Sequence, residues 1–338
     1  MEPRPIAEHT KVDRAAFERD VLPRYEPAVL RGVVAHWPAV AKARESAAAF
    51  ESYVSGFDNG TEVDALRMPP SAHGRIFYAA GLEGFNFTRE RMTLSAVLER
   101  LRKYARQQNP PGLAAQSALI ADCLPGFGAQ NVLAILDASI APRIWLGNAT
   151  ITPAHFDESS NVACVIAGRR RFTLFPPEQI ENLYIGPLGY APTGTPVSLV
   201  SLHEPDFARF PRFREALAAA RTADLEPGDA MYIPALWWHH VESLDTHNAL
   251  VNYWWRGNGA GQGKAPSALD CLLLGILNLR HLPPEQREAW RAIFDHYIFA
   301  ADTETAGHIP KAKRGVLGEI SPELAQQVRE FLVSQLRR

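Results

Sequence analysis

Two short segments of this 338-residue chain hold side chains that could share one metal ion. Thr152–Asp157 reads TPAHFD and contains one histidine and one aspartate, and Trp237–His240 reads WWHH and contains two further histidines. Two imidazoles and one carboxylate on one face of a metal leave the opposite face open. Non-heme Fe(II) oxygenases use this arrangement to hold a co-substrate and O2 together. The residue types therefore make metal-dependent oxygenation the first chemistry to test.

The spacing of these residues allows a shared ion without requiring one. Asp157 lies two residues beyond His155, so both side chains point to the same face of an extended strand. The competing interpretation is a turn at a strand end, in which Asp157 accepts a backbone N–H. Only one of His239 and His240 can face the same metal if the backbone is extended, and the pattern alone does not say which. A packed core edge beside the tryptophans is the structural alternative for this pair.

A cation is also expected near the metal. A co-substrate that chelates iron through a 2-oxo acid carries a distal carboxylate, which needs a cation and a polar neighbour. The alternating segment Arg169–Phe175 places Arg170 on the same face as Phe172 and Leu174. A charge on such a face is costly unless it meets an anion, so Arg170 is the expected interior cation. The alternative is a bend that lets all three consecutive arginines reach solvent.

An amide is expected on a third strand. Alternation in Leu250–Trp255 places Asn252 on one face with Leu250 and Trp254, which makes the amide an isolated polar group on an apolar surface. A buried amide should have a hydrogen-bond partner. That partner is either a ligand in the site or the protein's own backbone.

Short strands must position these side chains. Between Ser117 and Gly257, apolar or alternating runs are separated by proline, glycine and asparagine, a texture typical of a β-sandwich or barrel. The expected strands are Arg143–Gly147, Asn161–Ala167, Arg171–Phe175, Ala230–Pro234 and Ala249–Trp255.

Helical periodicity flanks this β-rich part on both sides. Before it, the expected helices are Ala15–Tyr25 and Met92–Tyr104, the second capped by Thr93, and the expected strands are Ala28–Gly32 and Arg75–Tyr78. After it, the expected helices are Leu269–Leu277, the segment from Pro283 to Phe299, and Pro322–Leu336. We therefore expect a mixed α/β support region over 1–115, a catalytic β core over 116–260 and a helical region over 266–338.

Composition argues against several classes of protein. A formal net charge of −2 gives no electrostatic footprint for nucleic acid, and 46% hydrophobic residues give no sign of disorder. The sequence lacks the long apolar run of a membrane-spanning helix and the pattern of a secretory signal, so we expect a soluble, cytoplasmic protein. Cys123, Cys164 and Cys271 are widely spaced and suggest neither a disulfide framework nor a zinc ribbon.

Longer motifs surround the candidate residues and follow one another in order. They are T-P-x-H-[FY]-D at Thr152–Asp157, G-x-x-R-x-x-L-F-P-P at Gly168–Pro177, G-D-x-x-[YF]-I-P-x-x-W-W-H at Gly228–His239 and V-N-Y-W at Val251–Trp254. With these motifs the chain resembles the JmjC and cupin-like Fe(II)/2-oxoglutarate-dependent oxygenases. Within them it is most similar to the branch of the asparaginyl hydroxylase called factor inhibiting HIF. The similarity is close from Trp145 to Gly257 and weaker elsewhere.

The resemblance implies a mainly β fold with flanking helices. Its core would be a double-stranded β-helix, also called a jelly-roll or cupin fold, followed by a C-terminal helical segment. The resemblance assigns His155, Asp157 and His239 as Fe(II) ligands and leaves a structural role for His240. Other matching positions contact 2-oxoglutarate or line its site, namely Thr152, Asn161, Arg170, Asn252 and Trp254.

Two positions depart from the family pattern. Arg170 stands where the family has its 2-oxoglutarate lysine, and it can still form a bidentate pair with a carboxylate although it occupies more volume. The branch often supplies a tyrosine hydroxyl from the strand before Pro125, whereas Ser117–Asp122 contains no tyrosine. Ser117 is the expected substitute, and the alternative is that the co-substrate binds differently.

The resemblance predicts a hydroxylase that consumes 2-oxoglutarate and O2 at Fe(II) and releases succinate and CO2. A protein or peptide side chain is the expected substrate, with a small molecule as the alternative, and a homodimer through the C-terminal helices is the expected assembly. Two other classes fit the same three ligands. One is a cupin metalloenzyme, an isomerase or hydrolase that does not use 2-oxoglutarate, and the other is a non-catalytic cupin binding protein.

Overall fold

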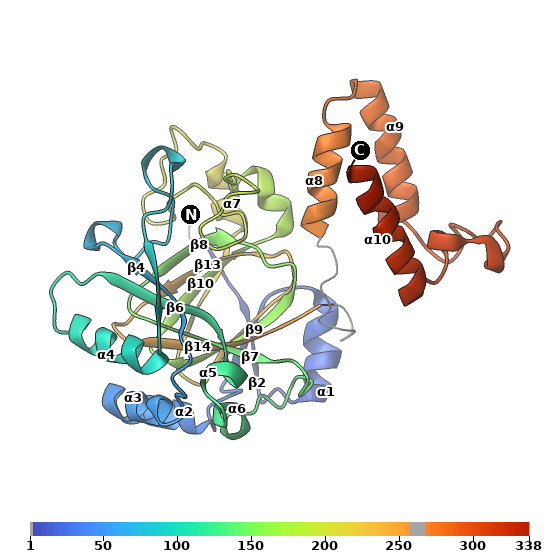
Figure 1. Ribbon diagram of the computed structural model, residues 1–338. Helices are drawn as coiled ribbons and strands as arrows, with labels where there is room; N and C mark the ends of the chain where they lie inside the picture. The colour runs from blue at the N-terminus through green and yellow to red at the C-terminus, as the bar shows by residue number, and fades with distance from the viewer. Residues whose placement is uncertain (1–2, 257–267, 338) are drawn as a thin grey trace. The chain divides into compact units, whose positions relative to one another are not determined.

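The computed structural model describes residues 3–256 and 268–337 (Figure 1). The chain divides into two compact units, Met1–Gly263 and Lys264–Arg338. Strands dominate the first unit and helices make up the second. This confirms the predicted fold class, mainly β with flanking helices and a C-terminal helical segment.

Two β-sheets form the body of the first unit (Figure 1). The smaller sheet has five strands, in the order β1 (Arg4–Pro5), β11 (Arg221–Leu225), β10 (Arg170–Phe175), β13 (Trp238–Ser243) and β8 (Ile151–His155). The larger sheet has nine strands, in the order β2 (Ala7–Thr10), β3 (Ala28–Arg31), β12 (Ala230–Ile233), β9 (Ser160–Ala167), β14 (Asn248–Trp255), β7 (Pro142–Gly147), β6 (Gly112–Leu119), β4 (Val63–Met68) and β5 (Thr88–Met92).

Both faces of the central strands are buried, so each strand contributes side chains to two separate cores. On β9, Val162 and Cys164 belong to one hydrophobic cluster, whereas Ala163 and Val165 belong to another. The second cluster also contains Phe172 from β10 of the smaller sheet, so it lies between the two sheets. Alternation thus directs every second side chain of these strands toward the space between the sheets.

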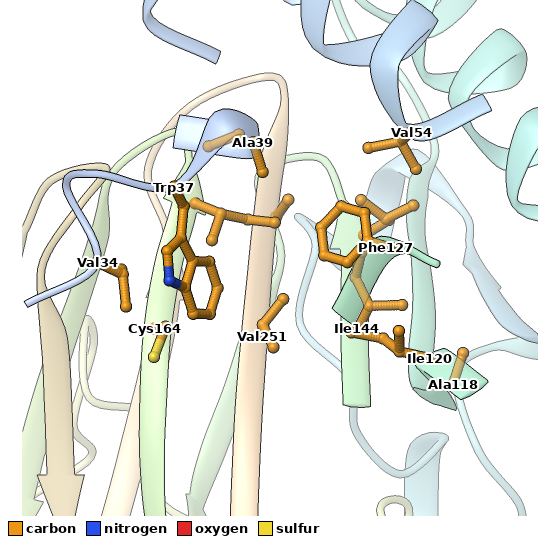
Figure 2. Close-up of a cluster of buried hydrophobic side chains, with 14 of the residues drawn as sticks. Val34, Trp37, Ala39, Val54, Ala118, Ile120, Phe127, Ile144, Cys164 and Val251 are labelled. Atoms are coloured by element: carbon orange, nitrogen blue, oxygen red, sulfur yellow. The ribbon is translucent and has the colours of Figure 1, made fainter. Parts of the chain in front are cut away.

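The other cluster lies between the larger sheet and a layer of helices, α2 (Pro38–Glu45), α3 (Ala47–Ser55) and α4 (Leu94–Tyr104). Figure 2 shows Trp37, Phe127 and Val251 within this cluster. Trp37 is fully buried, and its indole N–H donates to the Val132 carbonyl at 2.9 Å. This layer covers the outer face of the larger sheet and leaves the space between the sheets for the polar residues described below.

Most predicted elements are present in the first unit. All five strands expected for the core are found as β7, β9, β10, β12 and β14, within one or two residues of the predicted bounds. Thr93 caps α4 by accepting from the Ala96 N–H at 3.2 Å, as predicted. The helix expected at Ala15–Tyr25 is present as three short consecutive pieces, α1 (Arg14–Ala16), a π-helical turn at Phe17–Val21 and a 3-10 turn at Leu22–Arg24.

The strand predicted at Arg75–Tyr78 is wrong. Arg75 and Tyr78 form only isolated bridges, to Ile151 and Phe85. The side-chain amide of Asn86 accepts from the Phe77 N–H and donates to the Arg75 carbonyl, both at 2.9 Å. Because this side chain meets two backbone groups of the segment and the Ile76 N–H donates to the Ile151 carbonyl, no continuous strand ladder forms here.

The predicted boundary near residue 115 falls within β6, which spans Gly112–Leu119. The strands β2 to β5 of the support region extend the same sheet that contains β9 and β14. The division of the first unit into a support region and a core therefore stays a prediction, and the two share one sheet.

The second unit contains the three helices expected from the sequence. They are α8 (Ala268–Leu279), α9 (Pro284–Phe294), which continues as a π-helical turn at Asp295–Phe299, and α10 (Pro322–Leu336). Ser321 caps α10 by accepting from the Leu324 N–H at 3.2 Å. Within the described ranges, every helix falls short of the combined length and apolar character needed to cross a bilayer.

Candidate active site

His155, Asp157 and His239 come together between the sheets. His155 ends β8, Asp157 follows it by two residues, and His239 lies on β13 directly opposite His155 in the strand register. The Nε2 atom of His239 is 3.7 Å from an Asp157 carboxylate oxygen, and one ligand atom from each of the three residues lies within 4.8 Å of the others. Two imidazole nitrogens and one carboxylate oxygen at this spacing can bind one divalent metal ion.

A β-bulge aims two β8 side chains into the same space. His155 pairs with His239 and Thr152 pairs with Val241, so three residue steps on β8 match two on β13. Regular alternation would place side chains three positions apart on opposite faces of a strand. Because the bulge adds one residue, Thr152 and His155 both line the cavity between the sheets.

The backbone selects the tautomer of both imidazoles. Nδ1 of His155 lies 2.8 Å from the Pro153 carbonyl oxygen, and Nδ1 of His239 lies 3.0 Å from the Trp237 carbonyl oxygen. A carbonyl oxygen can only accept, so each Nδ1 carries the proton and donates it. Burial, and then the adjacent His155, lower the pKa of His239. The Nε2 lone pairs are therefore free for a metal, in the orientation that metal-binding histidines adopt.

Two indole N–H groups donate hydrogen bonds to Asp157 and Asn252. The Trp254 N–H donates to Oδ2 of Asp157 at 3.0 Å, and the Trp145 N–H donates to Oδ1 of Asn252 at 2.9 Å. The two tryptophan rings contact each other edge to face, with 6.0 Å between their centroids. The Asn252 amide therefore has a side-chain partner, whereas the sequence left open a ligand or the backbone.

All eight residues singled out from the sequence line one cavity of about 210 Å³. Thr152, Asn161, Arg170, Asn252 and Trp254 surround it together with the three candidate metal ligands. Seven of the eight lie on strands of the two sheets, β8, β9, β10, β13 and β14, and Asp157 follows the end of β8. The prediction that Asn252, Leu250 and Trp254 share one strand face agrees with this arrangement, because all three line the cavity.

Arg170 is a buried cation that has no carboxylate partner among the described residues. Its neighbours Arg169 and Arg171 reach the surface and pair with Asp245 and Asp224, at 2.9 and 2.7 Å. Arg170 is 8% exposed, its Nε is buried without a hydrogen-bond partner, and no carboxylate in residues 3–256 or 268–337 pairs with it. Burial lowers the pKa of its guanidinium to about 10. A buried cation in this state is stabilised by an anion bound in the cavity.

Asn161 offers a second group without a partner. Its Oδ1 is buried and unpaired in the described structure, and its side chain lines the same cavity as Arg170. The donor set and these unsatisfied groups fit a metal ion together with a small carboxylate ligand. Asn161 and Arg170 supply hydrogen-bonding capacity that the protein itself leaves unused.

Other cavity residues escaped the sequence analysis. Gln116 and Trp145 line it from β6 and β7, and Thr193 and Thr195 line it from the long connection between β10 and β11. Alternation in Pro142–Gly147 could have indicated Trp145, whereas Gln116 lies within the β6 bulge between Ala115 and Ala118, which no sequence pattern signals. Ser117, the expected substitute for the family tyrosine, also lines the cavity and has a backbone φ of 49°.

His240 lies on the opposite face of β13 from His239. Its Nε2 is 3.1 Å from a carboxylate oxygen of Glu242, which shares that outer face. Of the two adjacent histidines, His239 is therefore the one that approaches Asp157.

A known protein family matches the part of the chain that carries the site. Residues 14–260 match the family model described as a cupin-like domain. HSPB1-associated protein 1 of Homo sapiens is 33% identical over 149 residues, which are 44% of this chain and 30% of that protein. Lysine-specific demethylase 8 of Xenopus tropicalis is 27% identical over 253 residues, covering 71% of this chain and 50% of that protein.

A plant protein gives a similar alignment. Lysine-specific demethylase JMJ30 of Arabidopsis thaliana is 29% identical over 251 residues, which are 71% of this chain and 52% of that protein. The chain spans about half the length of the two demethylases and less than a third of HSPB1-associated protein 1. Placement within the asparaginyl hydroxylase branch stays a prediction.

Trp254→Phe should weaken metal binding by about 10- to 100-fold, because it removes the hydrogen bond that orients Asp157 and keeps an aromatic ring in the wall. Isothermal titration with Fe(II) or Mn(II) under anaerobic conditions measures the change. Trp255→Phe is the matched control, since Trp255 packs against Tyr232 on the other face of β14. Equal affinities in the two variants would refute a role for the Trp254 indole.

Proposed function

Because the chain belongs to the cupin-like domain family, we propose that it is an Fe(II)- and 2-oxoglutarate-dependent dioxygenase that hydroxylates a C–H bond of a protein or peptide side chain. The observation that carries this proposal is the joint presence, in one cavity, of a His-Asp-His cluster and a buried arginine without an anion. The cluster fits a divalent ion, and the arginine fits the far end of a dicarboxylate.

Each residue has a proposed part in holding these groups. His155, Asp157 and His239 would bind iron through two Nε2 atoms and a carboxylate oxygen. Arg170 would pair with the distal carboxylate of 2-oxoglutarate, with Thr152, Asn161 and Asn252 supplying hydrogen bonds and Trp254 closing the wall. When bound together with O2, iron and 2-oxoglutarate supply the oxidant for hydroxylation of a substrate C–H bond, with release of succinate and CO2.

The protein's own contribution is orientation and exclusion of water. The carbonyls of Pro153 and Trp237 fix the two imidazole rings, and the Trp254 indole fixes one oxygen of Asp157. Apolar side chains from both sheets, Phe172, Ile233 and Leu250 among them, surround the polar groups. Apolar walls strengthen the attraction between Arg170 and a bound carboxylate and help to keep water from a reactive centre.

Arg170 favours the oxygenase over the two other classes. A cupin isomerase or hydrolase that does not use 2-oxoglutarate needs the three metal ligands but has no evident need for a buried cation beside them. A non-catalytic binding protein has no need for three ligand groups with preset tautomers. A dicarboxylate co-substrate accounts for both the ligand cluster and the cation.

A protein or peptide is the proposed substrate, and a small molecule is the alternative. Two of the similar proteins are named lysine-specific demethylases, and a third is named for its association with another protein. Thr193 and Thr195 bring the connection between β10 and β11 to the cavity, where it can act as a lid that selects the substrate. Mass spectrometry of a modified peptide separates hydroxylation, which adds one oxygen atom, from demethylation, which removes a methyl group.

Anaerobic protein with Fe(II) and 2-oxoglutarate should show the weak visible metal-to-ligand charge-transfer band and should form succinate when O2 is admitted. His155→Ala should lose the band and succinate formation together, because it removes one of three ligands, and its metal affinity should fall by about a hundredfold or more. His36→Ala, at an exposed histidine away from the cavity, is the control. Iron binding without band or succinate in the unaltered protein would favour the other two classes.

Arg170→Met should raise the Kd for 2-oxoglutarate by about a hundredfold or more, since it removes one partner of a buried charge pair and leaves the carboxylate unpaired. Titration of the metal-loaded protein under anaerobic conditions measures this Kd independently of turnover. Arg171→Met is the matched control, because that arginine is the next residue on β10 and pairs with Asp224 on the outer face. A similar Kd in both variants would show that Arg170 does not anchor the co-substrate.

We also propose a homodimer through the C-terminal helices. Among the described residues of the second unit only Ala306 is buried, whereas many large apolar side chains are exposed. These include Leu272, Leu273, Leu277, Trp290, Ile293, Tyr297, Ile298, Phe299, Phe331, Leu332, Val333 and Leu336. Helices that bury so little of their own apolar surface gain stability when a second copy covers it.

Replacement of both Leu277 and Phe299 by Asp should convert the dimer to a monomer, because these side chains are 71% and 77% exposed and would carry charge into the interface. Light scattering during size-exclusion chromatography gives the mass of each species. Val132→Asp, at a 55% exposed position in the first unit, is the control. A monomeric unaltered protein at micromolar concentration would refute the proposed assembly.

A further inference from the structure

A second group of metal-binding side chains lies on the outer face of the smaller sheet. His240 and Glu242 are two residues apart on β13, and both point away from the cavity that His239 and Val241 line. His203, from the connection between β10 and β11, lies over them. Its Nε2 is 3.5 Å from one Glu242 oxygen, and Nε2 of His240 is 3.1 Å from the other. One ligand atom from each residue lies within 4.8 Å of the others.

Glu242 is a buried carboxylate that pairs with two imidazoles. It is 5% exposed, and within the described part of the chain no lysine or arginine forms an ion pair with it. Arg171, its neighbour across the strands, is held by Asp224 through two hydrogen bonds of 2.7 and 2.8 Å. A buried carboxylate is costly unless a cation compensates its charge.

Arg75 is the other cation that acts on this cluster. Its guanidinium lies 3.6 Å from the centre of the Phe77 ring and donates to the Val200 carbonyl at 3.4 Å. Its charge acts on His240 and opposes a metal there, but among the described residues it does not form an ion pair with Glu242. Within the described part of the chain, the side chains that pair directly with Glu242 are therefore the two imidazoles.

We propose that His203, His240 and Glu242 form a second metal site, which binds Zn(II) or a similar divalent transition-metal ion. Two imidazoles and one glutamate are a common protein donor set for zinc, with water at the fourth position. The carboxylate already lies between the two imidazole nitrogens, so little rearrangement is needed. The side chain of His203 is 55% exposed, which gives an ion a path to two otherwise buried ligands.

The site would fasten a cavity-lining segment to the sheet. Upstream of His203, the chain carries Thr193 and Thr195 at the cavity and then runs beside β8, where the Ser198 N–H donates to the Ala154 carbonyl at 2.8 Å. An ion bound by His203 and two β13 residues would add a second attachment after this one. The proposed role is structural, and it involves no residue of the His155, Asp157 and His239 cluster.

Equilibrium titration with Co(II) tests the site without any assay of activity, since four-coordinate Co(II) absorbs visible light much more strongly than six-coordinate Co(II). The unaltered protein should bind two equivalents of Co(II). The His155→Ala variant should keep one equivalent, the strongly absorbing Co(II) ion at the second site. In the His155→Ala background, His203→Ala should raise the Kd of that remaining ion by about a hundredfold. His36→Ala in the same background is the control, at another exposed histidine.

Two results would overturn the proposal. One is the absence of a strongly absorbing Co(II) ion from both the unaltered protein and His155→Ala. The other is an equal Kd for Co(II) in the His203→Ala and His36→Ala variants. In either case Glu242 acts only as a hydrogen-bond acceptor between two histidines. His203 is exposed, so its replacement leaves the core packing unchanged, and circular dichroism before titration verifies this.

Discussion

The register between β8 and β13 is the constraint on which the site depends. His155 faces His239 only because the two strands pair at this offset, and a shift of one residue would bring His240 to the cavity and turn His239 outward. The bulge between this pair and the Thr152–Val241 pair brings a second β8 residue into the same space. The strand pairing therefore decides which polar groups meet and which stay on the outer face.

The chain separates three consecutive arginines by the same alternation. Arg169 and Arg171 pair with surface aspartates, while Arg170 enters the space between the sheets, where burial disfavours its charge. Hydrophobic contacts of Phe172 and Leu174 on the same strand face hold β10 in place. The fold thus tolerates a buried cation because its apolar neighbours fix the strand, and the cost to stability is concentrated at the site that can use it.

Alternation explains how much of this could be predicted from the sequence. It placed Arg170, Asn252 and Trp254 on the faces where the structure has them, because buried strands leave each side chain only two directions. It could not choose between His239 and His240, since that choice depends on a partner strand far away in the sequence. It also missed β6 and β8, where a bulge and Pro153 interrupt the pattern. It wrongly assigned Arg75–Tyr78 as a strand, because the Asn86 side chain takes up two of that segment's backbone groups. The cluster of His203, His240 and Glu242 could not be predicted, because an irregular connection supplies one of its members.

The two indole donors have a consequence for cooperativity. Trp145 and Trp254 donate hydrogen bonds without adding charge to the cavity. Asp157 and Arg170 carry single charges of opposite sign, so the acidic and basic side chains that line the cavity sum to zero. A divalent ion alone, or a dianionic co-substrate alone, would give the cavity a net charge. A net charge shielded from water raises the free energy of the complex. Bound together they cancel, so each ligand should favour the binding of the other through this shared electrostatic free energy.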